Sequence, residues 1–113
     1  MEIQYHKSLN SGRWCTMTIM EQLAHIGSEV SRASKWQGRD EKIFQGATER
    51  ALELFDLTLS DLRWQKTGRL REIARVRELF CQAVTGGENE YKTSLEDLNN
   101  YFFPFSFAVR KDI

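Results

Sequence analysis

Residues 18–36 read TIMEQLAHIGSEVSRASKW, and the spacing of apolar side chains in this stretch predicts an α-helix. The apolar positions recur every three or four residues: Ile19, Leu23, Ile26, Val30 and Ala33. Such spacing returns to the same side of a helix, so these residues form one buried stripe. Polar residues repeat the spacing on another face: Gln22, His25, Glu29 and Arg32. A helix with these two faces is typical of the rim of a hydrophobic core.

Two more helices are predicted in the middle of the chain. The second spans about residues 40–59, and Asp40 is a suitable N-cap because its carboxylate can accept from free N–H groups of the first turn. Apolar side chains cover most of this segment, so we expect it to be the most buried helix. The third spans about residues 69–85 and ends at Gly86 and Gly87, which readily adopt a left-handed C-terminal cap.

A fourth helix is predicted to begin near Ser94, because Thr93 and Glu96 have the spacing of a capping box. Pro104 falls within this helix, where it lacks a backbone donor and its ring collides with the preceding turn. We therefore expect the fourth helix either to kink at Pro104 or to stop near Phe103.

Short connections between these helices favour antiparallel neighbours, so the sequence predicts an all-α fold, a four-helix up-down bundle. A chain of 113 residues is typical of one domain with one core. We assign residues 17–113 to the bundle. Residues 1–16 are polar and unpatterned, which predicts an N-terminal arm and leaves open whether that arm is ordered.

The composition excludes several classes of protein. Sixteen Lys and Arg balance sixteen Asp and Glu, so no net charge attracts the chain to nucleic acid or membrane. Apolar residues at 41% exclude general disorder, and no apolar run approaches the roughly 18 residues of a membrane-spanning helix. The first residues lack the apolar stretch of a secretory signal, so we expect a cytoplasmic protein. In that compartment Cys15 and Cys81 are expected to be reduced thiols.

Charges are distributed unevenly along the chain. Residues 40–61 hold six acidic and two basic side chains, a net −4, whereas residues 63–77 hold six basic and one acidic, a net +5. One interpretation is that the acidic second helix and the basic third helix lie side by side and form ion pairs at their rims. The alternative is a binding site for RNA or nucleotide phosphate with an aromatic ring for stacking. Its candidate residues are Trp64, Lys66, Arg71 and Arg75.

Catalytic and metal-binding motifs are absent from the sequence, which has no GxGxxG, GxxxxGK[ST], GxSxG or HExxH pattern. The best metal candidate is the i,i+4 series Glu21, His25 and Glu29. Bundles that bind two metals take a Glu-x-x-His pair from each of two helices, and this chain has no such pair. We expect a polar helix surface in which Glu29 pairs with Arg32 or His25. The sequence thus predicts no metal, no cofactor and no enzymatic activity.

An aromatic cluster near the C-terminus indicates a contact surface. Residues 101–107 read YFFPFSF, and one helix face cannot cover so many rings. Some rings then stay exposed in a monomer and form an interface with a homodimer partner or another protein. The alternative is that a kink at Pro104 wraps all the rings around one core. The candidate interface residues are Tyr101, Phe103, Phe105 and Phe107.

Two segments, LAHIGSEVSRASKW at residues 23–36 and ATERALELFDLTLSD at residues 47–61, resemble the HEPN domains, small all-α bundles that often accompany minimal nucleotidyltransferases. The resemblance is one of helix length, order and patterning over about residues 18–110. Ribonuclease members of that family carry an Arg followed four to six residues later by His, and neither His6 nor His25 follows an Arg at that distance. The resemblance therefore implies a non-catalytic partner or binding module.

Overall fold

The structure, a computed structural model, describes residues 11–65, 67–85 and 94–111, with side chains from residue 13 to residue 105 within these ranges. Every regular element in this part of the chain is helical, which confirms the predicted all-α fold. One short and four long α-helices follow one another: α1 (Ser11–Trp14), α2 (Ile19–Trp36), α3 (Glu41–Leu59), α4 (Arg69–Val84) and α5 (Leu95–Lys111). A 3-10 turn, η2 (Leu62–Trp64), lies between α3 and α4.

Capping residues fix the ends of α2 and α3 close to the predicted positions. Thr18 Oγ1 accepts from the N–H of Glu21 at 3.1 Å, and Glu21 Oε1 accepts from the N–H of Thr18 at 3.0 Å. This reciprocal pair starts α2. Asp40 caps α3, as predicted, by accepting from the N–H of Ile43 at 3.1 Å. Between the two helices Gly38 has a φ of +76°, a left-handed conformation that favours glycine.

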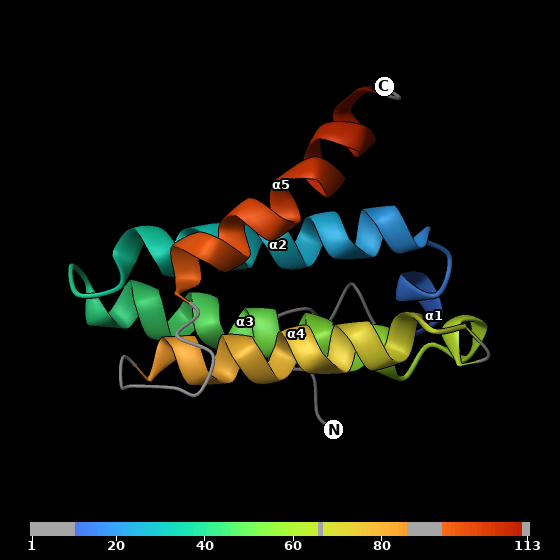
Figure 1. Ribbon diagram of the computed structural model, residues 1–113, viewed down its shortest axis with the longest axis horizontal. Helices are drawn as coiled ribbons and strands as arrows, with labels where there is room; N and C mark the ends of the chain where they lie inside the picture. The colour runs from blue at the N-terminus through green and yellow to red at the C-terminus, as the bar shows by residue number, and fades with distance from the viewer. Residues whose placement is uncertain (1–10, 66, 86–93, 112–113) are drawn as a thin grey trace.

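The four long helices alternate in direction, as in an up-down bundle (Figure 1). α2, α3 and α4 run nearly side by side, whereas α5 crosses α2 at an angle. α5 packs chiefly against α2 and much less against α4. The C-terminal half of α5, the red end of the ribbon, stands clear of the other helices (Figure 1). No helix in the described ranges is both long enough and apolar enough to cross a membrane.

Apolar side chains from all five helices meet in one core. The predicted stripe of α2 is buried apart from Ile19, which is half-buried. α3 contributes more buried residues than any other helix in the described part, as its broad apolar pattern predicts. At the centre, the ring of Phe55 lies 5.7 Å from that of Phe80 and 6.2 Å from that of Phe102, measured between centroids. These rings join α3, α4 and α5.

The core includes Trp14 of α1, whose side chain is 0% exposed. Its indole N–H donates to the hydroxyl of Thr58 in α3 at 3.0 Å. We expected the bundle to begin at residue 17 and assigned Trp14 to the N-terminal arm. Trp14 instead belongs to the core of the bundle. Residues 1–10, the rest of the expected arm, lie outside the described residues.

α5 begins at Leu95, close to the predicted start near Ser94, and continues through Pro104. Ser94 Oγ accepts from the N–H of Asp97 at 3.1 Å, and Asp97 Oδ2 accepts from the N–H of Ser94 at 3.1 Å, so these two residues form a capping box. Thr93, the cap expected from the sequence, lies outside the described residues. The helix continues beyond Pro104 to Lys111 and does not stop near Phe103. Pro104 and Asn100 are both exposed, so water can reach the Asn100 carbonyl that Pro104 leaves without a donor.

Candidate interaction surface

The inner face of α5 is fixed against α2 and the core. Leu95, Leu98 and Phe102 are buried on this face. Phe102 lies directly over Gly27 of α2, where an added Cβ would come within 2.7 Å of the Phe102 Cβ. Glycine at this position therefore allows α5 to approach α2 closely. The contact sets which residues of α5 face inward and which face outward.

Three rings of α5 pack against one another at the edge of the core. Phe102 lies 5.1 Å from Tyr101 and 6.3 Å from Phe105, and all three rings meet edge to face. This arrangement is the favourable one for aromatic pairs because ring edges and faces carry opposite partial charge. Tyr101 and Phe105 are half-buried as a result. Tyr101 and Phe105, two of the four candidate interface residues, therefore pack partly against the core of the same chain.

The hydroxyl of Tyr101 ties α5 to α4. It donates to the carboxylate of Glu72 on α4. Burial, and then the hydrogen bond to Glu72, raise the pKa of Tyr101 well above its ordinary value of 10. The phenol is therefore neutral at physiological pH and acts as a hydrogen-bond donor.

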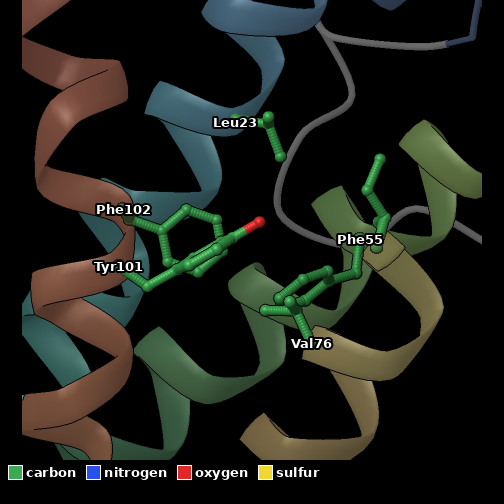
Figure 2. Close-up of a pocket in the computed structure, with 6 residues that line it drawn as sticks. Leu23, Phe55, Val76, Tyr101 and Phe102 are labelled. Carbon is green, nitrogen blue, oxygen red and sulfur yellow. The ribbon is translucent and has the colours of Figure 1, made fainter. Parts of the chain in front are cut away.

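A narrow gap lies beneath Tyr101 and Phe102, between α5 and the other long helices (Figure 2). Its walls are hydrocarbon apart from the Tyr101 hydroxyl, and it is too small for a water molecule. The lining residues are Leu23, Phe55, Ile73, Val76, Tyr101 and Phe102. The gap is a feature of core packing and offers no room for a ligand.

The outer face of α5 carries Phe103, whose side chain is 66% exposed. We define this face by the exposed residues of the helix: Glu96, Asp97, Asn100, Phe103 and Pro104. Phe103 is one of three large apolar side chains exposed in the described part of the chain, with Ile43 and Leu62. The side chain of Phe107 lies outside the described residues. The predicted interface stays a prediction, and Phe103 is its most exposed described member.

The alternative phosphate site is only partly assembled. Arg71 and Arg75 are exposed on the outward side of α4, as expected. Trp64 is half-buried, its indole N–H donates to Gln22 Oε1 at 3.0 Å, and the Arg63 guanidinium lies 4.4 Å from the centroid of its ring. One face of the ring is therefore covered from within the chain. Lys66 lies outside the described residues.

The interpretation that the acidic second helix and the basic third helix lie side by side and form ion pairs is confirmed at one pair. Arg77 Nε of the basic α4 donates to Asp56 Oδ1 of the acidic α3 at 2.9 Å. Both side chains are about one-third exposed, at 34% and 30%, so the pair adds little stability but favours this choice of neighbours.

A buried polar cluster closes the end of the bundle where α1 and η2 meet α2. Asp61 is 1% exposed, and its carboxylate accepts from Arg63 Nη2 at 2.7 Å and from Gln22 Nε2 at 2.9 Å. The same Gln22 nitrogen donates to the Trp14 carbonyl at 2.9 Å. The hydrogen bond from Arg63 is the largest influence on Asp61 and lowers its pKa from 3.8 to about 2. Gln22 was expected on the polar outer face of α2, and this prediction is wrong, because Gln22 is fully buried and hydrogen-bonded.

The three residues considered as metal ligands have separate structural roles. Glu21 takes part in the cap of α2, and the ring of His25 lies 5.8 Å from that of Trp14. Glu29 Oε2 accepts from Arg50 Nε of α3 at 3.0 Å, a partner that the sequence pattern does not indicate. Among the described residues no three His, Cys, Asp or Glu side chains gather as a metal site.

Both cysteines are free thiols, as predicted: Cys15 is exposed and Cys81 is half-buried in α4. Comparison of the chain with families of known proteins, with curated proteins and with solved structures finds no match.

Proposed function

We propose that this protein is a non-catalytic association module whose contact surface is the outer face of α5, centred on Phe103. The exposure of Phe103 carries this proposal. Pro104 beside it is exposed as well, so the face presents two adjacent apolar side chains. Covering the exposed part of a phenylalanine side chain stabilises a complex by about 1–2 kcal/mol for each molecule.

Two further features support an association surface on α5. The inner face of the helix is held by Gly27 and by the Tyr101 hydrogen bond to Glu72, so the outer face is presented on a fixed element. A fixed surface loses little conformational entropy when a partner binds. The HEPN resemblance implies the same class of function, a partner or binding module, and it stays a prediction, as does the cytoplasmic location.

The proposal is tested by copurification of the full chain at native expression level. The chain carries one tag, and a second copy with a different tag is present in the same cells. We expect wild type to retain a protein partner, either the second copy or another protein. Phe103→Ser is expected to lose it, because a serine hydroxyl cannot replace the apolar contact.

Leu62→Ser is the matched control, because Leu62 is 75% exposed but lies on η2. It makes the same chemical change at a similar exposure and is expected to retain the partner. Helical circular dichroism checks that all three chains are folded. Recovery of the same proteins with wild type and with Phe103→Ser would contradict the proposal.

A further inference from the structure

We infer that the partner of the outer face of α5 is a second copy of this chain, with the two α5 helices antiparallel. This inference rests on the proposed function. Phe103 is the middle residue of α5, which spans Leu95–Lys111. In an antiparallel pair of helices that overlap along their whole length, two-fold symmetry places the middle residue of one copy against the middle of the other. Phe103 then packs against Phe103 and Pro104 of the second copy.

Charges at the two ends of α5 favour the antiparallel direction. Glu96 and Asp97 lie in the first turn, and Arg110 and Lys111 are the last two residues of the helix. A two-fold axis beside Phe103 and Pro104 brings position 96 opposite 111 and position 97 opposite 110. Each acidic start then faces a basic end. Parallel pairing brings like charges together, which costs free energy and selects against that arrangement.

The same charges also suit the dipole of a single α5, which is positive at its N-terminus and negative at its C-terminus. Pairing between two copies and the match with the helix dipole predict opposite results for a chain in which the charges at positions 96 and 111 are exchanged. The exchanged charges are still complementary between two antiparallel copies, but they no longer match the dipole at either end of the helix.

The arrangement of the helices leaves space for a second α5. The C-terminal half of α5 stands clear of α2, α3 and α4 (Figure 1). The exposed side chains of the outer face point away from the core contact at Gly27. One helix face lies at the low end of the roughly 1,200–2,000 Å² that stable interfaces bury. We therefore expect a dimer that exchanges with the monomer at micromolar concentration.

Charge reversal at positions 96 and 111 tests the inference. Light scattering gives the molar mass of wild type, Glu96→Lys, Lys111→Glu, the double variant and an equimolar mixture of the two single variants, each over a range of concentrations. Asp97 is left unchanged because it caps α5. We expect wild type to dimerise and each single variant to associate about tenfold more weakly or worse. The double variant and the mixture are expected to recover dimerisation.

Glu78→Lys on the exposed side of α4 is the matched control and is expected to dimerise like wild type. Wild type that stays monomeric at every concentration would overturn the inference, as would single variants that dimerise like wild type. Either result leaves the proposed function standing if Phe103→Ser still loses a copurifying protein. The proposed function fails separately, if the same partner copurifies with wild type and with Phe103→Ser.

Discussion

Replacing Asp61 by asparagine is expected to destabilise the protein at neutral pH and to have less effect as the pH falls. The carboxylate is buried and accepts from Gln22 Nε2 and from the backbone N–H, Nε and Nη2 of Arg63. Asparagine keeps the shape of the side chain but carries no charge. Its NH₂ group also faces a donor, because donors approach both oxygens of Asp61.

The magnitude follows from the pKa of Asp61, which is lowered from 3.8 to about 2 in the folded chain. At about 1.4 kcal/mol per pKa unit this difference corresponds to about 2 kcal/mol of stability. Solvent screens the Arg63 side chain, which is 38% exposed, so we expect about 1–2 kcal/mol. The unfolded chain takes up the proton near pH 3.8 and the folded chain near pH 2. The stabilisation is therefore complete above pH 3.8 and is lost as the pH falls toward 2.

Urea unfolding, followed by tryptophan fluorescence and helical circular dichroism, measures this effect at a series of pH values. The free energy of unfolding of Asp61→Asn should lie about 1–2 kcal/mol below that of wild type at pH 7, and the difference should narrow below about pH 4. Asp56→Asn removes an ion pair with Arg77 in which both side chains are about one-third exposed, and it should cost at most about 1 kcal/mol at pH 7. A difference for Asp61→Asn that stays constant down to the lowest pH at which both proteins fold would refute the reasoning.

Three further substitutions test the packing and the helix ends by urea unfolding. Gly27→Ala should cost about 1–3 kcal/mol, because its Cβ would lie 2.7 Å from the Cβ of Phe102 and the α2–α5 contact would have to shift. Gly38→Ala should cost about 1–2 kcal/mol, because φ is +76° there although nothing crowds the site. Thr18→Ala should cost about 1 kcal/mol, because it removes the hydroxyl that accepts from the N–H of Glu21.

Gly46→Ala is the control for the first of these, since its Cβ would meet only the flexible end of Arg50 at 3.3 Å. It should leave stability unchanged or raise it, because alanine favours a helix over glycine. Equal losses from Gly27→Ala and Gly46→Ala would show that close contact with Phe102 is not the cause. For Gly38 and Thr18, a free energy of unfolding equal to that of wild type would contradict the roles of the left-handed turn and of the cap.

The helices could be predicted because their signals are local. The recurrence of Leu23, Ile26, Val30 and Ala33 defines a buried stripe within one segment, and Asp40 marks a helix start within one turn. The pairing of the acidic and basic helices was predictable from net charge along the chain, although the identity of the pair, Asp56 with Arg77, was not. Such pairs depend on the rotation of each helix about its axis, which only packing determines.

The burial of Trp14 and Gln22 could not be predicted, because their partners lie far away in sequence. Trp14 follows a polar segment without periodicity, and its hydroxyl partner Thr58 is 44 positions away. Gln22 is polar in sequence but buried in the fold, since Asp61 and Trp64 supply its hydrogen bonds. A polar residue is predicted to be solvent-exposed unless its buried hydrogen-bond partners are known.

The outward position of Phe103 was only partly predictable. The excess of rings in residues 101–107 indicates that some remain exposed, but it does not distinguish Phe103 from Tyr101 and Phe105. The close contact at Gly27 fixes the rotation of α5, and this rotation turns Tyr101 and Phe105 toward the core and Phe103 away from it. Glycine at a helix crossing carries no periodic signal, so the sequence did not separate the rings.

Backbone amide chemical shifts recorded at increasing protein concentration test the association surface most directly. Shifts that change with concentration identify the residues that enter a contact between copies. We predict changes concentrated at Glu96, Asn100 and Phe103 on α5, with Arg71 and Arg75 on α4 unchanged. Spectra that do not change with concentration, or changes confined to α4, would contradict the association of two copies through α5.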